Sequence, residues 1–472
     1  MKLPSASSAR ELIGLFARAG GLCPWHSHGA TARCQSVKHQ HSATEATDYA
    51  FEFIASTLRY GPNVTQELGH DVSRLAPGGR ILVVTDPVIR GLRPFKAVAE
   101  TLTKSRVDFD VFSNVRVEPT EQSVREAVEF ARGGNFGGFV AVGGGSTMDT
   151  AKAAALLTAN PDNDLLDFIG VPYGRNLSPD RPMMPLICVP TTAGTGSETT
   201  AVAVLDLKDK HAKVGIRNRA IKPHLGLVDP LNIETLPRHA TIYSGFDVLC
   251  HALESFTNRP FDQRKPRPPS PDKRPVYQGS NPISDVWVRQ ALSIIRLYLR
   301  RAVEDPSDTE ARAHMLMASS FAGMGFGNAG VHLCHGLSYA LSSLVRDYRS
   351  PDYPTEHPLV PHGLSVILTA PADFEFTGPA CPDRHLEAAA LLGADTSRAS
   401  PQDAGPILSD CIRTFAQEFR IPNGLRAVGY DRGDIPQLAE ASVPTMDNMP
   451  YAPRTQTRDQ IAGIYEASLE IY

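Results

Sequence analysis

Asp247 and His251 lie four residues apart in a segment whose apolar pattern predicts a helix. At that spacing both side chains project from one face of the helix, one turn apart. Two further histidines, His335 and His362, each precede a glycine in an apolar stretch. One carboxylate oxygen and three imidazoles can hold a divalent cation and leave room for a substrate oxygen. Without thiolates, Fe(2+) and Zn(2+) both fit, and the residue types do not decide between them.

Two other residues compete for this role. His332 lies three residues before His335, and Glu254 shares a helix face with Asp247. A lone histidine in an apolar helix is also usually a hydrogen-bonded core residue. The ligand set is therefore open at this point. A metal held here would act as a Lewis acid, which polarises a carbonyl or stabilises an alkoxide.

A glycine run upstream predicts a phosphate site. Gly143, Gly144 and Gly145 follow a predicted strand. The run through Ser146 opens a predicted helix at 149–157, which begins with Asp149. Glycines allow close backbone approach, and a helix N-terminus offers free N–H groups, so a pyrophosphate fits there. Ser146 is expected to cap the helix and to touch a phosphate.

Two further features favour a dinucleotide. Asp86 ends a predicted strand, where a carboxylate can accept ribose hydroxyls and repel a 2′-phosphate, which favours NAD over NADP. The plain alternative is a turn-forming aspartate before Pro87. A second loop supplies hydroxyl groups around a nucleotide, from Thr191, Thr192 and Thr195.

The elements that must position these residues fall into two parts. Alternating strands and helices predict a parallel α/β sheet, with strands at 80–86, 107–112, 137–142 and 185–190 and helices at 90–104 and 120–132. Helical periods then dominate, at 240–257, 282–304, 308–325, 329–345, 362–371, 403–419 and 457–471. The fold class is α/β plus all-α: a parallel-sheet dinucleotide-binding domain at 47–236 and a helical metal-binding domain at 237–472.

Composition limits the partners. The 472 residues carry a net charge of −4, which gives no electrostatic case for nucleic acid. No apolar run reaches the roughly 18 residues that span a bilayer, so no membrane contact is expected. Seven cysteines form no Cys-x-x-Cys pair, which favours reduced thiols inside a cell. Residues 1–46 are basic and rich in Ser and Ala, the composition of a mitochondrial transit peptide.

One segment interrupts the helical pattern. Residues 259–275 hold six prolines and six Lys or Arg against two Asp, which predicts a basic loop. A solvated loop is the simplest interpretation. The sharper hypothesis is that Arg264, Lys265 or Arg267 folds over the metal site and attracts carboxylates.

These motifs together resemble the iron-containing (group III) alcohol dehydrogenases. The matching blocks cover nearly everything after residue 47, at 143–149, 191–198, 245–254, 328–336 and 361–363. The resemblance implies that the metal is held by Asp247, His251, His335 and His362, which excludes His332. It also implies NAD at 143–149, Thr191, Thr192 and Asp86. Many members carry a histidine four residues after the ligand that matches His335, where this chain has Tyr339, so Tyr339 or a water chain would relay the proton.

Further blocks, at 48–52, 116–120, 277–285 and 357–366, look like a mitochondrial transhydrogenase branch of that family. This similarity implies oxidation of 4-hydroxybutyrate to succinate semialdehyde and reduction of 2-oxoglutarate to D-2-hydroxyglutarate, with NAD bound throughout. Both substrates are carboxylates, so a cation is expected, and the candidates are Lys213, Arg217 and the basic loop. A location in the mitochondrial matrix and a homodimer are also expected.

Three other functions are alternatives to this one. An ordinary NAD-dependent alcohol dehydrogenase would release NADH after each turnover. A sugar-phosphate cyclase, a lyase, would need several basic residues near the metal, and the sequence shows no such cluster. A non-catalytic binding protein would have no need for four intact ligands.

Overall fold

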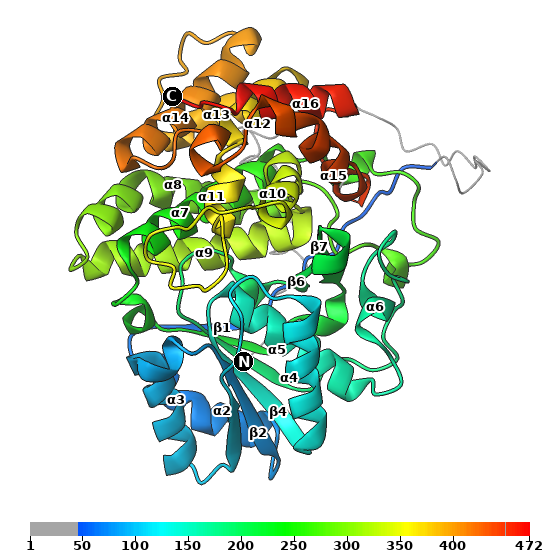
Figure 1. Cartoon of the computed structure of the whole chain (residues 1–472), viewed down its shortest axis with the longest axis vertical. Helices are drawn as coiled ribbons and strands as arrows, with labels where there is room; N and C mark the ends of the chain where they lie inside the picture. Colours follow the sequence, from blue (N-terminus) through cyan, green and yellow to red (C-terminus); the bar gives the residue numbers. More distant parts are fainter. Residues whose placement is uncertain (1–45, 449) are drawn as a thin grey trace, which may run out of the picture. The chain divides into compact units, whose positions relative to one another are not determined.

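Six parallel strands form the sheet of the N-terminal part (Figure 1). Their order is β1 (Thr57–Tyr60), β8 (Leu225–Val228), β5 (Leu186–Pro190), β4 (Phe136–Gly143), β2 (Arg80–Thr85) and β3 (Phe109–Phe112). Alternate residues of β2 enter different apolar clusters, with Leu82 and Val84 in one and Ile81 and Val83 in another. Both faces of the sheet are therefore covered, as in α/β proteins.

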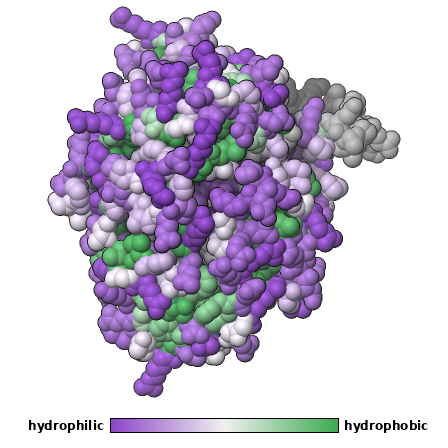
Figure 2. Space-filling model, in the orientation of Figure 1, coloured by the Kyte–Doolittle hydropathy of each residue, from purple (hydrophilic) through white to green (hydrophobic). Residues whose placement is uncertain are grey.

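The computed structural model describes residues 46–448 and 450–472, and Ala46–Tyr472 forms one compact unit. The predicted transit peptide thus lies outside the described residues, apart from Ala46. No helix in the described part is long and apolar enough to cross a bilayer. The face drawn in Figure 2 is mainly hydrophilic, with smaller apolar groups between.

The strand register brings the predicted nucleotide residues to one edge of the sheet. Thr85 pairs with Val142, and Gly143 pairs with Pro190. The residues that follow β2, β4 and β5 therefore emerge side by side at the carboxyl ends of the strands, where α/β sheets bind ligands.

Helices flank these strands, and a hairpin lies between β5 and β8 in the chain. The helices are α2 (Leu68–Leu75), α3 (Arg93–Lys104), α4 (Glu121–Gly133), α5 (Gly145–Ala159) and α6 (Leu165–Phe168). The antiparallel hairpin of β6 (Val202–Leu207) and β7 (Ala212–Arg217) was not predicted, nor were β1 and β8. These strands are only four to six residues long, and β1 has no apolar run.

Ten α-helices make up the second part of the described chain. They are α7 (Arg238–Thr257), α8 (Pro282–Glu304), α9 (Thr309–Ala329), α10 (Leu333–Ser343), α11 (His362–Ile367), α12 (Ala370–Thr377), α13 (Pro382–Leu392), α14 (Ala404–Phe419), α15 (Ile435–Asn448) and α16 (Arg458–Ala467). The α/β plus all-α class is confirmed. The helix predicted at 329–345 begins only at Leu333, because Gly330 ends α9 with φ +101°. The helix predicted at 362–371 is two helices, and α13 and α15 were not foreseen.

Candidate metal and nucleotide site

Three of the four predicted metal ligands direct donor atoms to one point. Asp247 of α7, His335 of α10 and His362 of α11 have donor atoms that all lie within 4.8 Å of one another. Asp247 Oδ1 is 3.4 Å from His335 Nε2 and 3.5 Å from His362 Nε2. Donors about 2.1 Å from one tetrahedral ion lie about 3.4 Å apart, so this spacing suits ligands of a shared ion.

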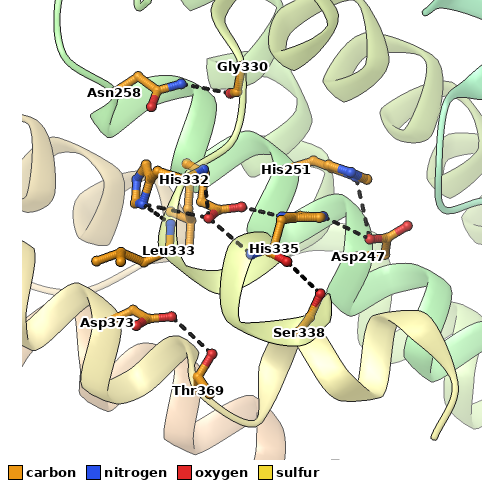
Figure 3. Close-up of polar contacts among 12 residues, drawn as sticks. Asp247, His251, Asn258, Gly330, His332, Leu333, His335, Ser338, Thr369 and Asp373 are labelled. Atoms are coloured by element: carbon orange, nitrogen blue, oxygen red, sulfur yellow. Dashed lines mark hydrogen bonds and ion pairs between the residues drawn. The ribbon is translucent and has the colours of Figure 1, made fainter. Parts of the chain in front are cut away.

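His251 lies beside this cluster and outside that group of three. Its Nδ1 is 3.6 Å from Asp247 Oδ1, and dashed lines in Figure 3 join Asp247 to both His251 and His335. The His251 ring is stacked against Phe326 and against His335, with centroids 3.8 and 4.3 Å apart. Nδ1 of His251, the ring nitrogen that faces Asp247, is buried without a hydrogen-bond partner. Buried unpaired nitrogens are costly, and a divalent cation is the partner that this donor set fits.

Glu254, which the sequence suggested as a competing ligand, instead contacts His335, a predicted ligand, at the ring nitrogen that faces away from Asp247. Its Oε2 contacts His335 Nδ1, and its Oε1 accepts a 3.0 Å hydrogen bond from the backbone N–H of His332. Burial alone would raise the pKa of Glu254, but His335 and His332 lower it to about 2. A carboxylate on the far nitrogen fixes the imidazole so that Nε2 faces the ion.

His332 makes its hydrogen bonds away from the cluster. Its Nδ1 accepts from the backbone N–H of Leu333 at 2.8 Å, so Nε2 is the protonated nitrogen, 3.0 Å from Thr257 Oγ1. Both ring nitrogens are therefore used. The structure places His332 as a hydrogen-bonded core residue.

A cavity of about 310 Å³ opens at the carboxyl ends of the strands. A Cβ on Gly144 would lie 3.1 Å from Thr192, and a Cβ on Gly145 would lie 2.6 Å from Thr195. A side chain at Gly145 would therefore force the second loop to shift, and one at Gly144 would be tightly packed against it. Thr191 Oγ1 is buried without a partner. The predicted residues that line this cavity are Asp86, Gly144, Gly145, Ser146, Thr191, Thr192, Thr195, Asp247 and His362.

Helix α5 begins differently from the prediction. Gly144 is its N-cap and no side chain caps it, so the expected cap by Ser146 is wrong. The Ser146 hydroxyl instead accepts a 3.1 Å hydrogen bond from the backbone N–H of Glu118. The free N–H groups of the first turn stay available to a phosphate.

The two carboxylates that were predicted to contact the nucleotide, those of Asp86 and Asp149, accept hydrogen bonds from other residues of the chain. Asp86 Oδ1 accepts from the N–H groups of Val88 and Ile89, both at 2.9 Å, and burial raises the pKa of Asp86. The turn expected from Pro87 is therefore present, and the residue still lines the cavity. Asp149 accepts from Ser197 Oγ at 2.8 Å and from the Val204 N–H at 3.0 Å, so it ties α5 to the loop and strand that follow β5.

A smaller inner cavity of about 110 Å³ has His251, His335 and His362 in its wall. Lys213 of β7 and Tyr339 of α10 also line it, with Lys213 Nζ 6.0 Å from the centre of the Tyr339 ring. His362 lines the nucleotide cavity as well. The ligand cluster therefore lies where the two cavities meet.

The partner of Lys213 was not predicted from the sequence. Its ammonium contacts the carboxylate of Glu118, 95 positions earlier in the chain. Burial alone would lower the pKa of Lys213, but Glu118 and Asp206 raise it, so the lysine is charged. Glu118 has φ +57°, an uncommon left-handed conformation for a side chain of this type.

Comparison with known proteins decides the family. A model described as iron-containing alcohol dehydrogenase matches residues 55–230, and the model of the C-terminal part of that family matches residues 276–469. The chain belongs to the iron-containing alcohol dehydrogenase family. It is therefore an oxidoreductase, and membership implies NAD and a divalent metal, which the donor cluster and the glycine-lined cavity fit.

Relatives of this family member are similar over their whole length. The mitochondrial hydroxyacid-oxoacid transhydrogenase of Caenorhabditis briggsae is 52% identical over 99% of this chain and 100% of its own, and that of Homo sapiens is 50% identical over 100% of both. The alcohol dehydrogenase structure from Oenococcus oeni is 27% identical, with a TM-score of 0.76 over 89% of this chain and 100% of that chain. The names of the first two support the expected mitochondrial location.

The basic loop of this family member does not cover the metal ligands. Arg264 contacts the buried carboxylate of Asp48, and Arg267 donates to the Thr47 carbonyl at 3.0 Å. Lys265 lines a separate pocket with both arginines. Arg217 lies with its guanidinium carbon 5.9 Å from the centre of the Tyr277 ring and, unlike Lys213, does not line the inner cavity.

Proposed function

We propose that this chain is a hydroxyacid-oxoacid transhydrogenase of the mitochondrial matrix. It oxidises 4-hydroxybutyrate to succinate semialdehyde and reduces 2-oxoglutarate to D-2-hydroxyglutarate through NAD that stays bound. Full-length relatives of that name support the activity. The observation that carries the chemistry is the ligand cluster at the junction of a nucleotide cavity and an inner cavity with a buried lysine.

When bound, the divalent metal supplies Lewis-acid polarisation of a substrate oxygen, and NAD supplies the hydride acceptor and donor. Asp247, His335 and His362 hold the ion, with His251 as the fourth ligand. Glu254 keeps the His335 ring in place. The helix N-terminus at 143–149, with Thr191, Thr192 and Thr195, holds the nucleotide, and Asp86 faces its ribose.

Lys213 binds the substrate carboxylate. In 4-hydroxybutyrate the carboxylate carbon lies three bonds from the carbon that loses hydride. In 2-oxoglutarate the distal carboxylate carbon lies three bonds from the carbon that gains it. One buried cation at a fixed distance from the metal can therefore orient both acids, and a pair of this kind is a strong, charge-assisted contact.

Tyr339 relays the proton. The alcohol loses a hydroxyl proton in the first half-reaction, and the ketone needs one in the second. Tyr339 lines the inner cavity, and burial raises the pKa of its phenol. A phenol that stays protonated can accept and donate within a chain of hydrogen bonds without losing its own proton to solvent.

The remaining expectations are part of the same proposal. The metal is Fe(2+) or Zn(2+), the enzyme is a homodimer, and the chain divides into nucleotide-binding and metal-binding domains at 236/237. Among the described residues that line the inner cavity, Lys213 is the one Lys or Arg. A sugar-phosphate cyclase would need more than one such group around its substrate phosphate.

The test mixes purified enzyme, 4-hydroxybutyrate and 2-oxoglutarate without added nucleotide. Coupled formation of succinate semialdehyde and 2-hydroxyglutarate is expected, with parallel-line kinetics in which the two acids bind in turn. Product that appears only when NAD is added, with NADH released to solution, would establish the alcohol dehydrogenase instead.

A further inference from the structure

Because NAD stays bound in the proposed function, the two acids need a route to the ligand cluster that NAD does not block. The inference below rests on that proposed function. The nucleotide cavity reaches the ligand cluster through Asp247 and His362. With NAD in that cavity, the two acids must exchange by another route on every turnover. The inner cavity therefore needs its own passage to solvent.

The walls of three cavities adjoin on the side of the inner cavity away from the nucleotide. Tyr277 lines the inner cavity and also a pocket of about 200 Å³ that contains Arg217. That pocket shares Pro275 and Tyr451 with a third pocket of about 420 Å³. The second and third pockets share no lining residue with the nucleotide cavity. The three cavities therefore adjoin through shared walls between the ligand cluster and the proline-rich loop.

The third pocket, which we term the basic pocket, has five basic residues in its wall, more than the carboxylates that pair with them, those of Asp48 and Asp272. No Asp or Glu is among the described residues that line it. Its five basic residues are Arg259, Arg264, Lys265, Arg267 and Lys273. Lys265, Arg267 and Lys273 are exposed, so their charges face solvent. Such a concentration of one sign attracts small anions from solution.

The loop that carries these charges is held in a fixed shape. Asp48 is 1% exposed and is bound by both Arg264 and Arg274. The Arg267 N–H donates to the Ala46 carbonyl at 2.9 Å. The two short turns of the loop, Phe261–Gln263 and Pro271–Lys273, lie between prolines. The backbone of the loop that forms the basic pocket is therefore anchored to the segment at Ala46 and Asp48.

We propose that the hydroxyacid and the oxoacid reach the metal through the basic pocket. A carboxylate meets Lys265 and Lys273 at the mouth, passes Arg217 in the middle pocket and ends at Lys213 in the inner cavity. Cations at successive depths lower the energy of an anion along the whole path, which raises its rate of arrival. Neutral alcohols gain nothing from this path.

Tyr277 is the partition between the middle pocket and the inner cavity. Its side chain is nearly fully buried, at 5% exposure, and its ring lies edge-on to Tyr451 with centroids 6.0 Å apart. The Tyr451 hydroxyl donates to the Tyr277 carbonyl at 3.0 Å, which holds the Tyr277 backbone in place. A rotamer change of Tyr277 then joins the two spaces.

The test reverses charge at the mouth of the basic pocket in the holoenzyme with NADH bound, by Lys265→Glu with Lys273→Glu. The matched control is Lys96→Glu with Lys210→Glu, exposed lysines that line none of these cavities. NADH fluorescence reports the second-order rate at which 2-oxoglutarate oxidises the bound nucleotide. At low salt the charge-reversed enzyme should react about tenfold more slowly than the control, and the difference should shrink in about 0.5 M salt.

A second measurement does not depend on the proposed activity. The dianionic chelator pyridine-2,6-dicarboxylate should remove the metal more slowly from the charge-reversed enzyme, whereas the neutral chelator 1,10-phenanthroline should remove it at an unchanged rate. If 2-oxoglutarate fails to oxidise NADH in the unaltered enzyme, the proposed function fails, and the chelators still decide the route. Equal rates in the charge-reversed and control proteins, or equal slowing of both chelators, overturn the proposed passage.

Discussion

The carboxylate of Glu254 contacts Nδ1 of His335, and both side chains are almost fully buried between α7 and α10. The same carboxylate accepts from the His335 backbone N–H at 3.3 Å. Glu254 therefore holds the ring and its backbone together, so Nε2 is directed toward Asp247. The orientation of His335, a proposed metal ligand, therefore depends on a residue outside the proposed ligand set.

Glu254→Gln should weaken metal binding by about 10- to 100-fold, because the amide cannot replace the negative charge behind the ring. Metal content after dialysis against graded chelator concentrations measures this. Ser338→Ala is the control, since it removes only the 2.7 Å hydrogen bond to the His335 carbonyl. Equal metal retention in the two variants would show that Glu254 has no orienting role.

His251→Gln should lower metal content, whereas His332→Gln should leave it unchanged. His251→Gln removes the fourth proposed ligand. We expect metal affinity to fall by at least about 100-fold, the upper end of the range for residues that only orient a ligand. His332→Gln keeps the metal and lowers the free energy of unfolding by about 1–3 kcal/mol, because Thr257 and Leu333 lose their partner. Metal analysis and denaturant titration measure the two effects. Retention of metal by His251→Gln would restrict the site to three protein ligands.

Lys213→Met and Glu118→Gln should change the Michaelis constants in opposite directions. Loss of the lysine charge should raise KM for both acids by about 10- to 100-fold, the size of a charge-assisted hydrogen bond. Loss of the glutamate charge should lower KM, because substrate no longer competes for the ammonium. Steady-state kinetics of both variants and of the double variant measure this coupling. Lys208→Met, in the same hairpin and half exposed, is the control.

Two outcomes would contradict the roles assigned to Lys213 and Glu118. If both KM values are unchanged in Lys213→Met, the lysine does not bind the substrate carboxylate. If Glu118→Gln raises KM, the glutamate holds Lys213 in position and does not compete with the substrate.

Tyr339→Phe should lower kcat by about 100-fold, the low end for loss of a proton-transfer group, with KM nearly unchanged. A solvent deuterium isotope effect that is present in the unaltered enzyme should change in this variant. Tyr298→Phe is the control, because Tyr298 stacks on His314 away from both cavities. A normal kcat in Tyr339→Phe would assign the relay to water.

Asp48 should make stability depend on acid pH. Burial alone would raise its pKa, but Arg274 and Arg264 lower it from 3.8 to about 2. Since the folded pKa is below the unfolded one, about 2 kcal/mol of stability is present above pH 4 and is lost as the pH falls toward 2. Denaturant titrations of Asp48→Asn should show this deficit at pH 7 and a smaller one at pH 3. Asp262→Asn, exposed in the same loop, should show neither, and an equal deficit at both pH values would contradict the assignment.

The amino-acid sequence by itself predicted the features that depend only on residues close together in the chain. The alternation of strands and helices, the glycine run before α5 and the helical spacing of Asp247 and His251 all follow from local sterics and periodicity. The break at Gly330 was missed, although a glycine is a local signal, because the apolar period continues across it.

Only the tertiary structure decided which distant groups meet. Glu254 and His335 are 81 positions apart, and Lys213 and Glu118 are 95 apart. No periodicity links such pairs, because their contact depends on how helices and strands pack and not on the spacing within one element. The same reason applies to the basic loop. Its charges are plain in the sequence, yet its position against the segment at Asp48, away from the metal ligands, exists only in the folded chain.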